Sequence, residues 1–463
     1  MVLEKYCQEI KQNIEYALAH LESENIISTE AFYNLYEKIN VDIRNSELLN
    51  HVQNIIGGIG FRVALKDNKV GFASTNNLLK DKILSTAKNS IKIARISSSN
   101  PDYSIPESSN PKKIKGLYNS DIIDLEIEDL IGIAKSGLES AEEYDKRITV
   151  KNGVVSIEHG FRGIINSLGV NVEDWESKIE LYLGTVGIEG QKVTGMHWEQ
   201  EHRRDFNIDP IMIGTKAGES TLKLLNPKRI ESFEGAVIFS PNITQLFQII
   251  TNAVKGDNVL LGASAWNDKI GDQVCDETLS IYDNSTLDEN IASHAFDDEG
   301  TPTQRTSLVE KGELIQFMQN CTSANGLEDV TTANASRYVT DFDIARMIIG
   351  GGYKTQPTVY SLNLTIKPGS KSLDQLITET EKGVFVDSMA GFPQVGSGVI
   401  SAQLSNAFLI ENGEIVFPLK DVMIAGNGYE WLMQISGIAN DSKQFLNHNI
   451  PSLRVEKVRI IGK

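Results

Sequence analysis

Residues 147–193 read RITVKNGVVSIEHGFRGIINSLGVNVEDWESKIELYLGTVGIEGQKV, and polar and apolar side chains alternate over most of this length. A period of two is typical of strands with one buried face. Three places interrupt the alternation with residue types that form tight turns: 152–153 (Asn-Gly), 159–160 (His-Gly) and 167–169 (Ser-Leu-Gly). The segment therefore predicts an antiparallel meander with turns at these places.

Helical periodicity surrounds this meander on both sides. In six segments apolar residues recur at spacings of three and four, as expected for helices with one buried face. These segments are residues 3–21, 79–95, 122–144, 211–225, 243–254 and 373–382. Strand-like runs fill much of the remaining chain, and they come in groups rather than alternating with helices. The pattern predicts an α+β fold, not a doubly wound parallel sheet.

Further segments carry the signals of β-hairpins. Residues 60–72 alternate and fold back at the polar turn 66–69, and residues 31–49 form another alternating stretch. Residues 308–314 and 409–415 each place a glycine after a polar residue, between two apolar runs. Shared turn chemistry explains the likeness of these last two segments more simply than an internal duplication does.

The length of 463 residues exceeds what one hydrophobic core of ordinary size covers. We place a domain boundary in the polar segment 226–234. The prediction is an N-terminal helix-and-sheet domain over residues 1–230, followed by a β-rich, largely antiparallel domain over residues 231–463.

The chain is acidic, with 44 Lys and Arg against 62 Asp and Glu and a formal net charge of −18. Binding to nucleic acid phosphates needs a basic surface, so this balance argues against direct nucleic acid contact. Lys112, Lys113 and Lys115 form one small basic cluster, which we interpret as part of a solvated loop.

The cysteines and the apolar runs indicate the cellular compartment. Cys7, Cys275 and Cys321 are odd in number and far apart, so they form neither a disulfide framework nor a CxxC metal knuckle. Reduced thiols fit a cytoplasmic protein. No apolar run approaches the ~20 residues that span a bilayer, and the N-terminus does not resemble a signal peptide. We expect a soluble, cytoplasmic protein without membrane contact.

By its residue chemistry alone the sequence offers no convincing active site. His197 and His202 are the one close histidine pair, but Trp198 stands where a zinc peptidase helix has its glutamate, and we favour a surface strand or loop. Residues 297–300 (Asp-Asp-Glu-Gly) have the oxygen ligands of a hard-cation site but not EF-hand spacing, and we favour a turn. Residues 350–355 lack the Gly-Lys pair of a phosphate loop and are interpreted as a flexible connector.

Several blocks, taken in order, resemble the TldD/TldE (TldD/PmbA) peptidase family. They read GIGFRV at 58–63, VGFAST at 70–75, NSLG at 166–169, DDEGTP at 297–302 with RT at 305–306, EKGVFV at 381–386, IENGE at 410–414 and GNG at 426–428. Each block is short. Their order and their spread over nearly the whole chain make the resemblance specific.

The zinc-bearing branch of that family carries an HExxxH helix between a strand and a Gly-Asp pair. The resemblance places the strand at 236–239 and Gly-Asp at 256–257, so Phe247, Gln248 and Asn252 stand where His, Glu and His would be. Phenylalanine cannot bind a metal, a glutamine amide does not act as a general base, and asparagine is a poor zinc ligand beside imidazole. These three residues are a degenerate zinc motif.

The branch's third ligand, a C-terminal cysteine, is also missing, since no cysteine follows Cys321. The resemblance therefore implies the metal-free TldE/PmbA branch, with no catalytic residue, no metal ligand and no cofactor of its own. It implies a heteromer with a TldD-type paralogous subunit, whose zinc cleaves small or unfolded peptides. This chain would shape the chamber and hold the peptide. The branch's older name refers to modulation of DNA gyrase.

Two alternatives remain open at this point. The chain could be a homodimeric peptide-binding or regulatory module that works without a protease. It could also be an independent metallopeptidase that uses His197 and His202, which we favour least. Whether the chain is itself an enzyme is left open by the sequence.

Overall fold

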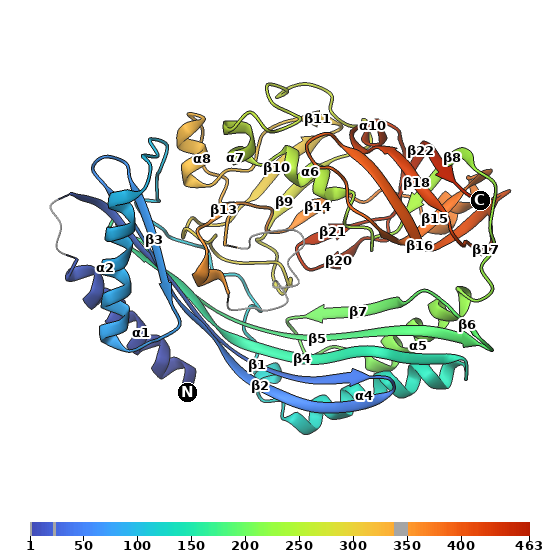
Figure 1. The fold of residues 1–463 in the computed structure, drawn as a ribbon, viewed down its shortest axis with the longest axis horizontal. Coiled ribbons are helices and arrows are strands. Elements are labelled where there is room, and N and C mark those ends of the chain that lie inside the picture. The colour runs from blue at the N-terminus through green and yellow to red at the C-terminus, as the bar shows by residue number, and fades with distance from the viewer. Residues whose placement is uncertain (1, 22–24, 338–350) are drawn as a thin grey trace.

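The computed structural model describes residues 2–21, 25–337 and 351–463. One long curved sheet with its helices forms one half of the molecule, and three smaller sheets with short helices form the other (Figure 1). Most strand pairs are antiparallel, and helices and strands are segregated along the chain. The predicted α+β class is confirmed.

The N-terminal sheet has the strand order β3-β2-β1-β4-β5-β6, and β7 pairs with β5 as well. Its strands are β1 (Ile26–Arg44), β2 (Glu47–Leu65), β3 (Val70–Thr75), β4 (Ile148–Asn166), β5 (Asn171–Glu189), β6 (Lys192–Val193) and β7 (His197–Arg203). Four of them have 19 residues each, well beyond the usual 3–10, so one sheet extends along the whole half.

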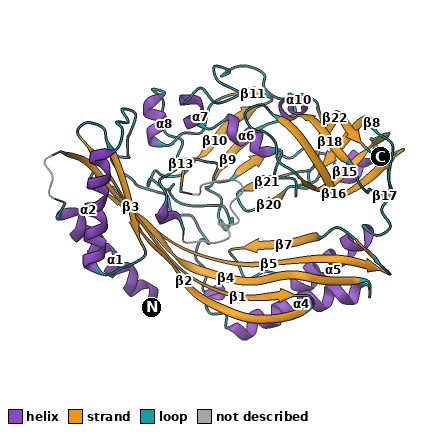
Figure 2. Ribbon diagram, in the orientation of Figure 1, coloured by secondary structure: helices purple, strands orange, loops and turns teal. Residues whose placement is uncertain are grey.

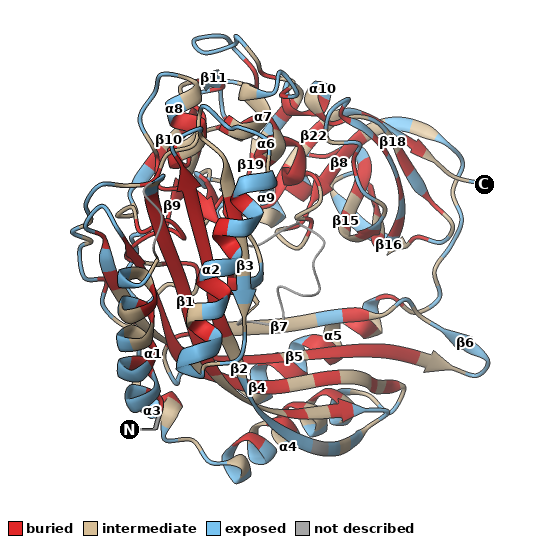
Figure 3. Ribbon diagram, turned by 60° about the vertical axis from the view of Figure 1, so that its left-hand side comes forward, coloured by how far each residue is buried: buried red, intermediate tan, exposed pale blue. Residues whose placement is uncertain are grey.

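Helices cover one face of this sheet (Figure 2). They are α1 (Val2–Ala19), α2 (Lys80–Ile96), α3 (Ser120–Ile123), α4 (Ile127–Tyr144) and α5 (Pro210–Lys223). Ile157 and Leu181 of the sheet share a buried core with Ala134 of α4 and Ile213 of α5. Because side chains alternate along a strand, the intervening positions point to the opposite face, toward the C-terminal half. Figure 3 shows buried positions along the middle of the sheet and exposed ones on the outer turns of α1 and α2.

Two of the three turns predicted within residues 147–193 are wrong. The dipeptides 152–153 and 159–160 both lie inside β4, and only the turn at 167–169 exists. A Cβ on Gly160 would lie 2.1 Å from the main-chain oxygen of Leu35 on β1. Gly160 therefore allows β4 and β1 to approach closely. Close approach of two strands is a reason for glycine that differs from turn formation.

The predicted helices 3–21, 79–95 and 211–225 match α1, α2 and α5, and the turn at 66–69 joins β2 to β3. The predicted helix 122–144 is divided, because its first residues belong to α3 and α4 begins at Ile127. The alternating stretch 31–49 is interrupted, because Asn45 and Ser46 adopt φ values of 49° and 65° and begin a hairpin. Both central residues of such a turn have positive φ, which asparagine tolerates better than most residues. The two-domain division stays a prediction.

The C-terminal half contains three sheets. Its strands are β8 (Phe233–Phe239), β9 (Ile281–Asn284), β10 (Arg305–Glu310), β11 (Glu313–Leu314), β12 (Ala335–Ser336), β13 (Thr358–Val359), β14 (Leu364–Ile366), β15 (Lys382–Ala390), β16 (Val399–Glu411), β17 (Glu414–Pro418), β18 (Met423–Asn427), β19 (Ile435–Ile438), β20 (Lys443–Phe445), β21 (His448–Ile450) and β22 (Leu453–Ile461). The largest sheet has the order β15-β8-β22-β18-β16-β17, and an additional β15–β16 pairing closes it on itself. Closure removes strand edges from this part of the molecule.

Short helices connect these strands: α6 (Phe247–Ala253), α7 (Gly256–Leu260), α8 (Cys321–Gly326), α9 (Leu373–Thr378), α10 (Gly428–Leu432) and the 3₁₀ turn η2 (Gly352–Lys354). The hairpins at 308–314 and 409–415 are confirmed as β10–β11 and β16–β17. Their central pairs have positive φ, as a type I′ turn requires. Of the predicted connector 350–355, residue 350 lies outside the described residues, and Tyr353 is buried rather than exposed. No helix in the described ranges is both long and apolar enough to span a membrane.

Candidate functional site

The acidic segment 297–300 lies between the two halves of the molecule, and all three of its carboxylates are buried. Asp297 accepts hydrogen bonds from the main-chain N–H groups of Glu299, Thr301 and Ala335 at 2.9–3.0 Å. Gly300 has a φ of 90°. The predicted turn is therefore present, and the Asp297 side chain holds it together.

The two remaining carboxylates bind arginines of the N-terminal sheet. Asp298 Oδ1 accepts from Arg162 Nη1 of β4 at 2.7 Å, and Glu299 Oε1 accepts from Arg62 Nη2 of β2 at 3.0 Å. The same Arg62 nitrogen lies 2.6 Å from Glu30 Oε2 of β1. These carboxylates join the two halves and are fully engaged by cations and N–H groups, which does not suit a hard-cation site.

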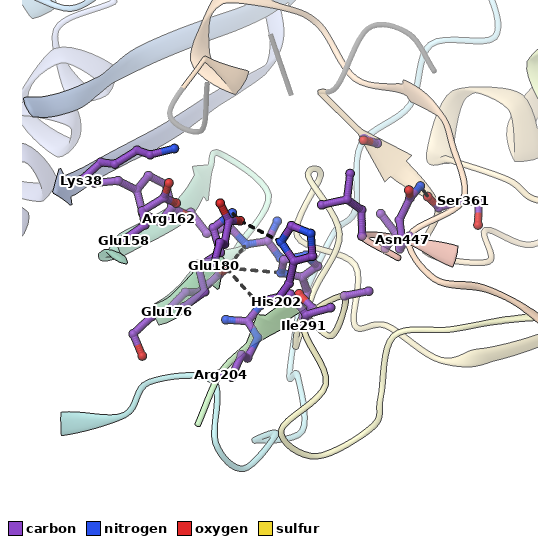
Figure 4. A pocket seen from close by; sticks show the side chains of 18 of the residues that line it. Lys38, Glu158, Arg162, Glu176, Glu180, His202, Arg204, Ile291, Ser361 and Asn447 are labelled. Carbon is purple, nitrogen blue, oxygen red and sulfur yellow. Dashed lines mark hydrogen bonds and ion pairs between the residues drawn. The ribbon is translucent and has the colours of Figure 1, made fainter. Parts of the chain in front are cut away.

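A cavity of about 180 Å³ lies next to this network, between the curved sheet and loops of the C-terminal half. The sheet contributes Tyr36 and Lys38 from β1, residues 154–162 of β4, residues 176–182 of β5, and His202 of β7. The opposite wall is formed by Ile291, Ala292, His294, Ser336, Tyr360, Ser361, Leu362, Leu446 and Asn447. Figure 4 shows Glu158, Glu180 and His202 on the sheet side, with Ser361 and Asn447 across from them.

Two glutamates of this cavity are held in ion pairs. Glu176 lies 3.2 Å from Arg162 Nε, 3.3 Å from Arg204 Nη2 and 3.2 Å from His294 Nδ1. Burial alone would raise its pKa, but His294 and the two arginines outweigh burial and hold the pKa of Glu176 well below its usual range. Glu176 is therefore ionised at any physiological pH.

Glu180 is paired in the same way. It forms an ion pair with Lys178 on the same strand, and His202 Nδ1 lies 3.4 Å from it on β7. Burial opposes ionisation, but Lys178 and His202 outweigh burial and hold the pKa of Glu180 far below its usual value. Glu180 therefore gives the cavity a second fixed negative charge.

Glu158 differs from both. Its side chain is buried, and its Oε2 atom has no hydrogen-bond partner. Burial raises the pKa of Glu158 to about 8, because the charge of Lys178 offsets only part of the cost of removing a carboxylate from water. At neutral pH this carboxyl is mostly protonated, and it lines the cavity with its Oε2 atom lacking a hydrogen-bond partner.

His197 and His202 both lie in β7, so the strand prediction is right, but the surface placement is wrong. Their side chains are 5% and 6% exposed. His197 lies 3.4 Å from Asp387 of β15 and 3.5 Å from Glu199. Side chains five positions apart in a strand point to opposite sides, so the two histidines do not converge. In the described part of the chain no group of three or more His, Cys, Asp or Glu is arranged to hold a metal ion.

Phe247, Gln248 and Asn252, which the family resemblance aligns with the zinc motif, lie on α6, and this helix is shorter than the predicted helix 243–254. The chain before it forms turns instead, with Ile243 N–H donating to Ser240 O and Phe247 N–H to Thr244 O. Phe247 is 1% exposed and belongs to the main C-terminal core. Gln248 is 7% exposed. The first residue of α6 is therefore an aromatic residue of the hydrophobic core.

Three family models match the chain in sequence order. The PmbA/TldA metallopeptidase domain 1 matches residues 29–94, the central domain matches residues 120–225, and the C-terminal domain matches residues 233–462. The chain belongs to the PmbA/TldD metallopeptidase family.

Relatives and solved structures agree with this family. An uncharacterized protein of Methanocaldococcus jannaschii is 29% identical over 431 residues, covering 91% of this chain and 94% of that protein. Metalloprotease PmbA of Escherichia coli O157:H7 is 25% identical over 439 residues, covering 92% and 90%. The crystal structure of TldE from Thermococcus kodakarensis has a TM-score of 0.85 at 24% identity, covering 98% of this chain and 100% of that chain. The last likeness shows the fold.

The sequence of this PmbA/TldD chain did not reveal the cavity residues. Glu176, Lys178 and Glu180 occupy alternate positions of β5, a pattern that normally marks a strand face in contact with water. Glu158 on β4 follows the same pattern. One feature could have indicated the cavity: four neighbouring strands carry charged residues on the same face. This shared face can be recognised only when the pairing register of the strands is known.

Proposed function

We propose that this chain is the metal-free, non-catalytic subunit of a cytoplasmic zinc metallopeptidase of the TldD/TldE type, which cleaves small or unfolded peptides. In this proposal the chain shapes the chamber and holds the peptide, and a TldD-type paralogous subunit carries the zinc. The observation that carries the proposal is the core position of Phe247, the residue that the family resemblance aligns with the first zinc-binding histidine.

The residues present do not fit a zinc ion. Phe247 has no donor atom and is packed among Leu246, Ile250 and other core residues. Gln248 and Asn252 offer amides, which bind zinc poorly compared with imidazole or thiolate. This chemistry supports a proposal in which another chain supplies the catalytic zinc.

The open edge of the curved sheet supports a partner subunit. β3 pairs with β2 only from Ile59 to Ala64, and the outer side of β2 over residues 47–58 meets no other strand in the residues that the structure describes. Leu49, Val52 and Ile55 are exposed there, and residues 48–58 contain no Asp, Glu, Lys or Arg. Soluble proteins usually protect such edges with charge or cover them, so a covering chain is expected.

The test is affinity purification of this chain from its native cell, with zinc measured in the recovered complex and in the chain alone. A TldD-type subunit in the eluate, with zinc in the complex and well under one zinc per chain in isolation, is the expected result. Stoichiometric zinc in the isolated chain would overturn the proposal. Recovery of this chain alone, as a homodimer, would favour the regulatory or peptide-binding alternative.

A further inference from the structure

We propose that the cavity between β1, β4, β5 and β7 and the C-terminal loops binds a primary ammonium group on a short apolar stem, with Glu158 as its counter-ion. This inference deepens the peptide-holding role, and it rests on that proposed function only for the source of the amine. Two parts of a peptide carry this chemistry: a lysine side chain and the N-terminal residue with its free amine.

The charged groups of the cavity are already paired, with one exception. Arg162 binds Asp298 and Glu176, and Arg204 binds Glu176 together with the main-chain oxygens of Leu117, Asn290, Ile291 and Ser293. Lys178 is engaged by Glu180. Among the cavity carboxyl groups that the structure describes, only Glu158 has an oxygen that is buried and without a hydrogen bond.

An ammonium group supplies the hydrogen-bond donor that Oε2 of Glu158 lacks. The carboxyl faces Lys38 of β1 and Glu176, Lys178 and Glu180 of β5, and His202 of β7 also lines the cavity. The two lysines favour its ionised form, while burial and the two glutamates disfavour it. A bound ammonium adds a positive charge and donates N–H groups to Oε2. An anion in the cavity would instead be repelled by the ionised Glu176 and Glu180.

Binding is then coupled to proton release. At neutral pH the carboxyl is mostly protonated, so a protonated amine binds as the Glu158 O–H proton leaves to solvent, which gives a carboxylate–ammonium pair. The total charge balances, because one positive charge enters as ammonium and one leaves as a proton. Affinity for the ammonium should therefore increase as the pH rises toward the pKa of Glu158, which is about 8.

The size and the walls of the cavity restrict the rest of the ligand. At about 180 Å³ it is smaller than the roughly 300–1,000 Å³ of sites for drug-sized molecules. Tyr36, Tyr182, Ile291, Leu362 and Leu446 supply apolar surface beside the charged groups. One side chain with a terminal amine fits this space, and a folded segment does not.

The experiment is calorimetric titration of the full-length chain with n-pentylamine and three short peptides. One peptide is blocked at both ends and contains a single lysine, the second replaces that lysine with norleucine, and the third has a free N-terminus and no lysine. We expect wild type to bind pentylamine and to release close to one proton per bound ligand at pH 7, as measured from buffers of different ionisation enthalpy. The norleucine peptide should not bind.

Two variants make the test specific for Glu158. Glu158→Gln keeps the shape and the neutral state of the side chain but cannot become an anion, so affinity for the amine should fall at least roughly tenfold, and proton release should disappear. Glu47→Gln, an exposed position of β2 on the same sheet, should bind like wild type. Melting curves at pH 5 that match wild type establish that both variants are folded.

Each outcome decides the inference. Binding of only the lysine peptide assigns the cavity to a side chain, and binding of only the free N-terminus assigns it to the terminal amine. No amine binding by folded wild type, or equal binding by Glu158→Gln, overturns the inference. Neither result bears on copurification with a TldD-type subunit, so failure of the inference and failure of the proposed function are seen in separate experiments.

Discussion

Arg62 Nη2 on β2 lies 3.0 Å from Glu299 Oε1, and the two residues are 237 positions apart in the chain. Both side chains are almost completely buried, and Glu30 Oε2 lies 2.6 Å from the same Arg62 nitrogen. The contact is one of a set, because Arg337 also binds Glu30 and Arg162 binds Asp298. A buried network of alternating charges thus joins the curved sheet to the C-terminal half.

Removing Arg62 should therefore destabilise the whole chain. Arg62→Met leaves two buried carboxylates without their shared cation, and removing one partner of a buried pair costs about 3–5 kcal/mol. Urea unfolding of wild type and of each variant measures the loss in the free energy of unfolding. Arg229→Met is the matched control, because Arg229 pairs with Asp421 at the surface and is 56% exposed, so its loss should cost less than about 1 kcal/mol. Equal costs for the two variants would contradict a structural role for the network.

Glu158 should make stability depend on pH. Its pKa is about 8 in the folded chain against an ordinary 4.5, so the folded state holds a proton that the unfolded state releases. The stability that this proton contributes is full below pH 4.5 and is lost as the pH rises through 8. Glu158→Gln should match wild type near pH 5 and exceed it at pH 9, by on the order of a few kcal/mol. Urea midpoints at the two pH values measure the difference, with Glu47→Gln as control, and a difference that is the same at both would argue against the buried neutral carboxyl.

The His197 side chain should link the curved sheet to β15 in a way that depends on pH. Burial disfavours its charged form, but the carboxylates of Asp387 and Glu199, at 3.4 and 3.5 Å, outweigh burial and raise the pKa of His197 to about 9. Its stabilising contribution is full below pH 6.5 and is lost as the pH rises through 9. His197→Gln should cost roughly 1–3 kcal/mol at pH 6 and much less at pH 10. His51→Gln, at an exposed position of β2, should show no such trend in the same thermal melts.

Restoring the family's zinc motif on α6 should not create a peptidase. Phe247→His, Gln248→Glu and Asn252→His together supply two imidazoles and a carboxylate, but a zinc site needs a closed ligand set held by surrounding hydrogen bonds. Placing His at the core position of Phe247 should also cost a few kcal/mol. Zinc affinity, melting temperature and peptide hydrolysis of the triple variant, with Phe247→Leu as a packing control, test this. Tight zinc binding with real turnover would show that the ligand set is nearly complete.

Local features of the fold could be predicted from the sequence, because their causes are local. The helices α1, α2, α4 and α5 follow from apolar spacing, and the hairpin at Asn412-Gly413 follows from turn chemistry. The uninterrupted length of β4 could not be predicted. Gly160 allows a neighbouring strand to approach closely, and such a glycine cannot be told from a turn glycine without knowing the neighbour.

The candidate site was less accessible to sequence reasoning. The acidic segment 297–300 was recognised as a turn, but its arginine partners lie 136 and 237 positions earlier, and no local pattern connects them. Glu158 and Glu180 were missed because a charged strand face suggests water, whereas here a second layer covers it. Only the register of β4, β5 and β7 brings these side chains together.

The buried charge network also constrains the order of events during synthesis. Arg62 and Arg162 leave the ribosome long before residues 297–299, and Glu30 precedes its partner Arg337 by 307 positions. Until those later residues emerge, Glu30 and Glu176 of the same sheet are the carboxylates that pair with Arg62 and Arg162. N-terminal segments generally fold first as they appear, but here Asp298, Glu299 and Arg337 are needed to complete the contacts of Arg162, Arg62 and Glu30. Emergence of Arg337, rather than completion of the curved sheet, is then the step that completes the buried charge network.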